Sequence, residues 1–434
     1  MALETSLSTE LPSSGVARFL LSWRFLRPAA IAYLVAVSLL WVVLIAMWLG
    51  GKNGRDAQGD VLGPDFPAFY TAGWMLRHGE ADKLYEAARQ REIQQSFLPG
   101  MKGVSAYINP PHYALLMQPL STLSYSTAFT VWTLFSLSCF VAGIMLLRTI
   151  LPELQTQCGN WLMALALGFT PVYYALSAGQ NTGFTLLLHT AILVALVKRR
   201  DFVAGFLIAA GLLKPQLFLP LLPLLVIARR PKALGAFAIG AAIVCFVTWR
   251  VVGLSVAQEW FATLSNAQHS EMARTYATNI IQQSYKMFSW QAFWRLLLGA
   301  NGVASALGWL CALGVFAALC RWWRSAGHDL PLCYALAVCA TIVMVPHVFL
   351  YDLALLVLPG LVLANRVLAL PAERLVALRF TMLMIFVGVV LIDQAQWTRV
   401  QFMVPLLTVT ALLAARLLLH NEDAAVAPLQ ASTV

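Results

Sequence analysis

The sequence predicts an all-α, polytopic integral membrane protein, and three observations lead to this prediction. Of the 434 residues, 60% are hydrophobic and only 11% are charged, with a mean hydropathy of +0.74. This composition is far too apolar for a soluble protein of that length. About twelve apolar segments follow one another along the chain, and short basic clusters separate several of them.

The apolar segments define the expected membrane domain, residues 28–419. The first, 28–50, exceeds the apolar region of a secretory signal and lacks an A-x-A-like cleavage site, so we expect an uncleaved span after a cytoplasmic segment, 1–27. The others are 126–148, 160–178, 182–197, 202–213, 215–228, 233–252, 303–320, 330–346, 349–364, 380–392 and 400–419. Segments 202–213 and 215–228 are short and meet at Lys214 and Pro215, which predicts a hairpin that enters from the cytoplasm and returns.

The basic clusters predict the orientation of the chain. VKRRD, ARRPK and RWWR lie between apolar segments, as cytoplasmic loops do, and the positive-inside rule then places both termini in the cytoplasm. The net charge of +10 therefore reflects topology, and no nucleic-acid partner is expected. Two large outer segments remain, 51–125 and 253–300; the first is expected to carry interfacial helices, one of them within 81–97. Residues 420–434 read as a disordered cytoplasmic tail.

Cysteine usage gives no sign of a metal centre or a disulfide framework. The seven cysteines lie in apolar segments or in a segment expected inside the cell, and none has metal-ligand spacing. We therefore expect neither a metal site nor a cofactor.

Polar residues that are unusual at membrane depth gather at the predicted outer ends of several segments. Such convergence from distant parts of the sequence is what a membrane-embedded active site requires. The candidates are Asp65, Tyr70, Asn109, Gln180, Asn181, Gln283, Ser284, His347, Tyr351 and Asp352, together with Lys214 at the turn of the hairpin and the outer-face cations Arg250, Lys286 and Arg295.

Simpler structural roles remain open for several of these residues. Asp65 could cap the short helix that begins near Pro67, as aspartate often does. Asn109 precedes two prolines and could serve a turn alone, and the stretch GQNTG could simply join two spans. Lys214 needs a partner or must reach the lipid headgroups, because a buried ammonium is costly.

Six stretches resemble glycosyltransferase family 87 in their order: DFPAFYTAGWMLRHGEADKLY, YINPPHYALLMQPLSTL, GQNTGF, LLKPQLFLPLLPLL, NIIQQSYKMF and PHVFLYDLALL. The resemblance covers residues 28–419 and implies a GT-C-like membrane enzyme of the cell envelope. It implies transfer of a sugar from a polyprenyl-phosphate carrier to a lipid or glycan acceptor, with inversion, at the outer or periplasmic face of the inner membrane. By its position in the first stretch, Asp65 is implied as the catalytic base. Members often use mannose donors, although no residue here identifies the sugar.

The residue types suit this chemistry. A glycosyl phosphate already carries a good leaving group, so one carboxylate suffices as the base. Cationic or hydrogen-bonding groups must stabilise the departing phosphate, and His347, Lys286, Arg250 and Arg295 are the candidates.

Two other functions are alternatives to sugar transfer. A transporter or flippase of lipid-linked sugars is the alternative, but it predicts internal symmetry and polar sites near the midplane. An acyltransferase using His347 would need a recognisable motif with an acidic or nucleophilic partner, and none is evident.

Overall fold

The computed structural model describes residues 23–157, 161–325, 329–370 and 375–419. Within these residues every regular element is a helix, which confirms the all-α prediction. Two isolated β-bridges pair Arg55 with Val61 and Met287 with Phe349. The predicted tail, 420–434, and residues 1–22 of the predicted N-terminal segment lie outside the described residues.

The chain is a membrane protein, and five of its described helical segments are long and apolar enough to cross a bilayer. These are α2 (Trp23–Gly50), α6 (Tyr125–Arg148), α14 (Pro231–Val251), α18 (Gly302–Trp323), and η5 (Leu350–Leu356) continuing into α20 (Val357–Leu368). Shorter apolar helices are α10 (Thr182–Val197), α11 (Asp201–Ala210) with η3 (Gly211–Leu213), α12 (Pro215–Phe218) with α13 (Leu221–Ile227), α19 (Leu330–Met344), α21 (Val376–Gly388) with η7 (Val389–Leu391), and α23 (Met403–Leu418). The total of about twelve membrane segments remains a prediction.

Two predicted segments differ from the observed helices. The segment 160–178 is divided into α8 (Trp161–Leu167) and α9 (Thr170–Ser177), because Pro171 stands at the start of α9 and cannot continue a preceding helix. Helix α2 begins at Trp23, five residues before the predicted start, so Pro28 lies inside the helix. Its apolar neighbours Phe25 and Leu26 extend the helical segment toward the N-terminus.

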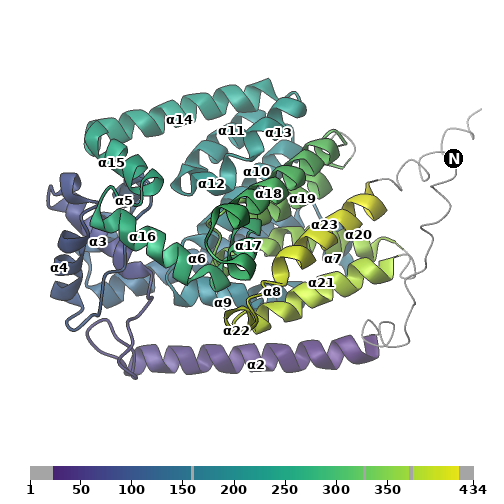
Figure 1. Cartoon of the computed structure of the whole chain (residues 1–434). Coiled ribbons are helices and arrows are strands. Elements are labelled where there is room, and N and C mark those ends of the chain that lie inside the picture. Colours follow the sequence, from purple (N-terminus) through teal and green to yellow (C-terminus); the bar gives the residue numbers. More distant parts are fainter. Residues whose placement is uncertain (1–22, 158–160, 326–328, 371–374, 420–434) are drawn as a thin grey trace, which may run out of the picture.

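Helices α2 and α14 mark two opposite edges of the molecule (Figure 1). Both end beside elements of the two predicted outer segments, most of which lie at one end of the molecule; we call this the loop end. The first segment contributes α3 (Phe66–Arg77), η1 (Ala81–Lys83), α4 (Ala87–Phe97), α5 (Pro111–Met117) and η2 (Leu120–Thr122). The second contributes α15 (Leu254–Ser265), α16 (Glu271–Gln282), η4 (Ser284–Lys286) and α17 (Trp290–Leu298). The remaining short helices are α7 (Pro152–Gln157) and α22 (Gln394–Thr398).

Large apolar side chains are exposed along the outer helices, as a lipid-facing surface requires. On α2 the exposed fractions reach 63% for Val42 and 83% for Leu49, and on α14 and α18 the same holds for Phe246 and Leu310. A soluble protein rarely exposes a contiguous apolar surface of this kind. Helices α10 and α19 are instead buried on nearly all sides and form the centre of the bundle.

The two predicted outer segments pack against each other. The guanidinium of Arg91 on α4 lies 2.9 Å from a carboxylate oxygen of Glu271 at the start of α16. The indole nitrogen of Trp260 on α15 donates to the backbone oxygen of Ile108 over 2.9 Å. Segments separated by more than 150 residues therefore form one structure at the loop end.

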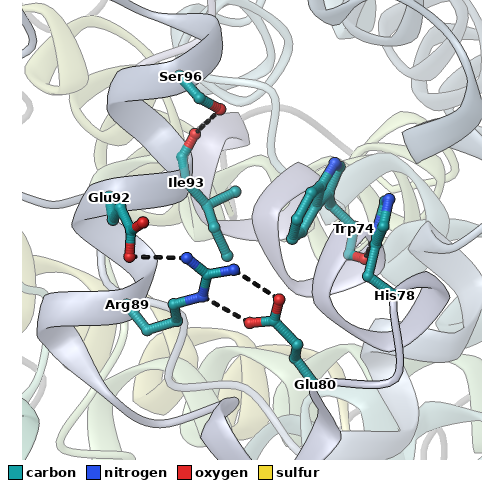
Figure 2. Close-up of polar contacts among 7 residues, drawn as sticks. All are labelled: Trp74, His78, Glu80, Arg89, Glu92, Ile93 and Ser96. Carbon is teal, nitrogen blue, oxygen red and sulfur yellow. Dashed lines mark hydrogen bonds and ion pairs between the residues drawn. The ribbon is translucent and has the colours of Figure 1, made fainter.

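A polar cluster fixes α4 against the end of α3 (Figure 2). The Arg89 guanidinium lies between the carboxylates of Glu80 and Glu92, 2.7 Å from the latter. Its centre also lies 5.9 Å from the ring of Trp74, whose other neighbour is the stacked ring of His78. The predicted amphipathic helix within 81–97 is thus present as α4, and the side chain of its residue Ile93 is buried.

Basic residues away from the loop end take part in ion pairs and hydrogen bonds. Arg230 pairs with Asp201 over 2.8 Å, which brings together the two ends of the predicted hairpin. Arg366 pairs with Asp329 over 2.7 Å, and Arg379 donates to the backbone oxygen of Val367 over 3.0 Å. The segment from α11 to α13 therefore folds back on itself, with its helical break at Lys214.

Candidate functional site

A cavity of about 600 Å³ opens among the loop-end segments and the ends of the central helices. Residues from seven separate stretches of the chain line it. Among those predicted from the sequence, the lining residues are Asp65, Asn109, Gln180, Lys214, Gln283, Lys286, His347, Tyr351 and Asp352. The structure therefore brings together most of the polar candidates that the sequence singled out.

Asp65 occupies the N-cap position of α3 but does not cap the helix. Its side chain accepts no hydrogen bond from the first turn of α3. One carboxylate oxygen instead accepts a hydrogen bond from Nε2 of Gln180 over 2.7 Å, and the side chain lines the cavity. Phe66 and Phe69 are buried on α3 directly after it and anchor the helix in an aromatic core. The capping role left open by the sequence is thus excluded.

The backbone between α9 and α10 places Gln180 against Asp65. Gly179 has a φ of +75°, and a Cβ there would approach the Cβ of Phe66 to 2.7 Å, so glycine alone fits without strain. The indole of Trp132 donates to the Gly179 oxygen over 2.8 Å, and the Asp65 amide donates to the Ala178 oxygen over 3.2 Å. These bonds fix the position of the loop that carries Gln180 beside Asp65.

Burial raises the pKa of Asp65 above its ordinary value, and the hydrogen bond from Gln180 and the charge of Lys214 lower it in part. A raised pKa makes a carboxylate a stronger base, because it binds a proton more tightly.

Lys214 and Asp352 form a buried ion pair in the wall of the cavity. The ammonium nitrogen lies 2.8 Å from Oδ1 of Asp352, with side-chain exposures of 8% and 5%. The other carboxylate oxygen accepts a hydrogen bond from the Phe349 amide over 3.2 Å, and the ammonium lies 5.3 Å from the ring centre of Tyr351. The partner that the sequence required for Lys214 is therefore Asp352, and the pair ties the break of the hairpin to η5.

Lys286 and His347 reach the same cavity because their segments run side by side. Met287 and Phe349 form a β-bridge, and the Phe288 amide donates to the Val348 oxygen over 3.0 Å. This pairing joins the second predicted outer segment to the loop between α19 and η5. It places an ammonium and an imidazole in the cavity wall that also contains Asp65.

His347 is held in its neutral form. Burial lowers its pKa to about 4, although the charge of Asp352 opposes this shift. Nδ1 of His347 lies 3.4 Å from the hydroxyl of Tyr276 on α16. At neutral pH the imidazole can therefore offer a hydrogen bond to a ligand but no positive charge. Lys286 also lines the cavity, and it has no carboxylate partner among the described cavity residues.

Five predicted residues do not line this cavity. Tyr70 is buried and donates to the Leu123 oxygen, Asn181 is buried at the start of α10, and the Ser284 hydroxyl bonds to backbone oxygens of α16. Arg250 is exposed at the end of α14. Arg295 lies on α17 and lines a different cavity.

Several lining residues were not anticipated from the sequence, namely Lys102, Ser105, Gln216, Tyr276, Asn279 and Asp393. Two of them, Tyr276 and Asn279, could have been recognised from their spacing in the sequence. Tyr276, Asn279 and Gln283 are spaced by three and four residues, which places them on one face of a helix. Gln216 lies in α12, two residues after Lys214, and Asp393 lies in the turn before α22, where the sequence has no periodic pattern.

The arrangement suits a proton transfer next to a developing negative charge. A carboxylate with a raised pKa can accept a proton, while Lys286 and His347 can bind an anionic group in the same cavity. Among the described residues, no group of three His, Cys, Asp or Glu side chains could hold a metal ion.

Comparison with known proteins identifies one family. The model of glycosyltransferase family 87 matches residues 107–346, more than half of the chain. No curated protein and no solved structure matches the chain.

Proposed function

The chain belongs to glycosyltransferase family 87 and is a membrane glycosyltransferase, and on this premise we propose that the cavity at the loop end is its active site. In this proposal a polyprenyl-phosphate carrier donates the sugar, and a lipid or glycan acceptor receives it with inversion at the anomeric carbon. Asp65 is the catalytic base.

The observation that carries this proposal is the position of the Asp65 carboxylate and its hydrogen bonding. Its carboxylate lines the cavity, does not cap its helix, and is held by one neutral donor, Gln180, over 2.7 Å. A carboxylate committed to a salt bridge would have a low pKa and would be a weak base. Asp65 instead has a raised pKa and remains available to a substrate.

The proposed reaction is a single displacement. The acceptor hydroxyl oxygen forms a bond to the anomeric carbon as its proton passes to Asp65. The bond between that carbon and the phosphate oxygen breaks, and the phosphate leaves with the electron pair. Lys286 stabilises the growing negative charge, and neutral His347 donates a hydrogen bond to a phosphate oxygen.

The ion pair of Lys214 and Asp352 has a positioning role in this scheme. Because each charge is already compensated by the other, the pair adds little net field to the cavity. It fixes the break of the hairpin beside η5, which carries Tyr351. It thereby holds the cavity wall next to Asp65 in one shape.

We also propose that the cavity faces the outer or periplasmic side of the inner membrane, with both termini in the cytoplasm. Contacts between the two predicted outer segments support their lying on the same side of the membrane. The ion pairs of Arg230 and Arg366 support a second, shared side for the basic segments. The positive-inside rule then assigns the basic set to the cytoplasm. A lipid carrier and its acceptor can meet at such an interface without crossing the bilayer.

A transfer assay tests the proposal. Purified protein in lipid vesicles is incubated with labelled polyprenyl-phosphate sugars, including mannose, and with extracted membrane lipids as acceptors. A labelled product identifies a transferase, whereas movement of the intact donor across the vesicle membrane without a product would identify the transporter or flippase alternative.

Substitution of Asp65 tests its role in the same assay. Asp65→Asn is nearly isosteric and should fold and bind donor, yet it cannot accept a proton, so transfer should fall by about 10²-fold or more. Asp65→Glu keeps the base but displaces it and should retain intermediate activity. Asp60→Asn is the matched control, because Asp60 is exposed and does not line the cavity. Wild-type transfer by Asp65→Asn would remove Asp65 from this role.

A further inference from the structure

A second cavity of about 580 Å³ lies next to the first, between α15, α16, α17 and the start of α18. The two cavities share wall residues Tyr276 and Ile280 of α16. The second cavity contains none of the residues assigned above to sugar transfer. Its function therefore has to be inferred from its own lining.

Arg295 is the one charged residue among those that line the second cavity. Its guanidinium is partly buried on α17, and its hydrogen bonds go only to neutral oxygens, the Ser284 hydroxyl at 3.3 Å and the Ile280 backbone at 3.5 Å. Both contacts are long. No carboxylate pairs with Arg295 in the described part of the chain. A partly buried, unpaired guanidinium is costly, and an anionic ligand would compensate its charge.

Two further features of this cavity favour an anion. The hydroxyl of Thr263, a residue only 1% exposed, has no hydrogen-bond partner among the described residues although Thr263 lines the cavity. The N-terminus of α18, a helix of 22 residues, also lines the cavity, and there the side-chain oxygen of Asn301 accepts a hydrogen bond from the Ala304 amide. A helix N-terminus carries a partial positive charge and free N–H groups. A hydroxyl, a guanidinium and helix amides together match the oxygens of a phosphate.

Most of the remaining lining is apolar, apart from Tyr276, Gln291 and Ser305, and it indicates what is attached to that phosphate. It is formed mainly by Leu264, Ala267, Ala273, Ala277, Ile280 and Ile281. Ile281 and Leu264 are 53% and 37% exposed, so the apolar wall continues to the molecular surface. On the neighbouring α15, Leu254 and Phe261 are also exposed, as expected for a helix lying at a membrane interface. A free phosphate would gain nothing from these walls, whereas a lipid tail would.

We propose that the second cavity binds the phosphate headgroup of a membrane lipid, with Arg295 as the principal phosphate ligand and Thr263 as a hydrogen-bond donor. The lipid tail leaves the cavity along Leu264 and Ile281. This site is distinct from the cavity of Asp65 and does not depend on the proposed transfer reaction. Its position across α16 provides a holding site for a phospholipid or lipid phosphate next to the reaction cavity.

Equilibrium binding of radiolabelled dodecyl phosphate, in micelles of a neutral detergent, tests the proposal. The full chain carries Lys286→Ala and His347→Ala in all samples, so that binding in the first cavity is suppressed. Arg295→Gln should then weaken binding by about 10- to 100-fold, as expected for loss of a charge-assisted hydrogen bond. Thr263→Val should weaken it less. Arg274→Gln is the matched control, because Arg274 is exposed on α16 and lines neither cavity.

The outcomes separate a lipid site from other possibilities. Unchanged affinity in Arg295→Gln, or an equal loss in Arg274→Gln, would overturn the proposal. Displacement of dodecyl phosphate by millimolar inorganic phosphate would reveal a site for a free anion and overturn the assignment to a lipid. If Arg295→Gln does not elute as a folded species, Thr263→Val decides, and unchanged binding by that variant would overturn the proposal. Asp65→Asn should bind dodecyl phosphate normally, so failure of the transferase assignment leaves this result intact.

Discussion

The hydrogen bond from Gln180 to Asp65 is the contact on which the proposed base depends most directly. We consider replacing Gln180 by Met, which has a similar length but cannot donate a hydrogen bond. The bond is 2.7 Å long and Gln180 is 5% exposed, so water cannot readily replace the lost donor. A hydrogen bond to a charged group contributes about 1.5–3 kcal/mol. If that energy positions Asp65 in the transition state, kcat/KM should fall by about 10- to 100-fold.

The pH dependence gives a second, independent readout. The base must be ionised, so kcat/KM should fall as the pH decreases through the pKa of Asp65. Burial raises this pKa, and the bond from Gln180 lowers it by favouring the ionised form. Removing the bond should therefore move the acid limb of the profile to higher pH. A variant with only a general folding defect would lose active protein without moving that limb.

The assay measures initial rates of sugar transfer to acceptor between acidic and neutral pH for three proteins, the wild type, Gln180→Met and Gln216→Met. Gln216 also lines the cavity but makes no hydrogen bond to Asp65, which makes it the matched control. We expect the shifted acid limb only in Gln180→Met. A wild-type profile and rate in Gln180→Met would refute the view that this bond positions the base.

Three further predictions follow from the same structure. Lys214→Met should destabilise the protein by about 3–5 kcal/mol, because Asp352 is left buried without its partner; a smaller loss of thermal stability in the double variant Lys214→Met/Asp352→Leu is the expected contrast, and equal losses would contradict it. Lys286→Ala should lower kcat/KM by an amount equivalent to about 2–4 kcal/mol, and an unchanged rate would place the donor phosphate elsewhere. In a cysteine-free background, a cysteine at exposed Ser255 should react with an impermeant thiol reagent added to intact cells, and one at exposed Lys232 should not; the reversed pattern would invert the proposed topology.

The interior of the reaction cavity illustrates what the sequence could predict about the site. Polar residues within apolar segments are recognisable in the sequence because burying them is costly. That signal identified Asp65, Gln180, Lys214, His347 and Asp352, which all line one cavity. The same signal could not show which of these residues contact one another, such as the hydrogen bond from Gln180 to Asp65.

Lys286 and Arg295 illustrate what the sequence could not predict about the site. Both are cations in the same predicted outer segment, nine residues apart, and no sequence pattern distinguishes them. In the structure Lys286 lines the reaction cavity and Arg295 lines the second cavity. Their separation follows from the pairing of Met287 with Phe349 and from the start of α17 at Trp290, which direct the two side chains to different cavities.

The sequence by itself determined the all-α membrane class and the position of the helical break at Lys214 and Pro215. These features depend on local physics: apolar segments partition into lipid, helices satisfy their own backbone hydrogen bonds there, and proline cannot continue them. Only the tertiary structure decided that Lys214 pairs with Asp352, 138 residues away, and that Asp65 is held by Gln180 rather than capping its helix. Such contacts depend on how helices distant in the sequence pack together, and no local pattern encodes the distance between their side chains.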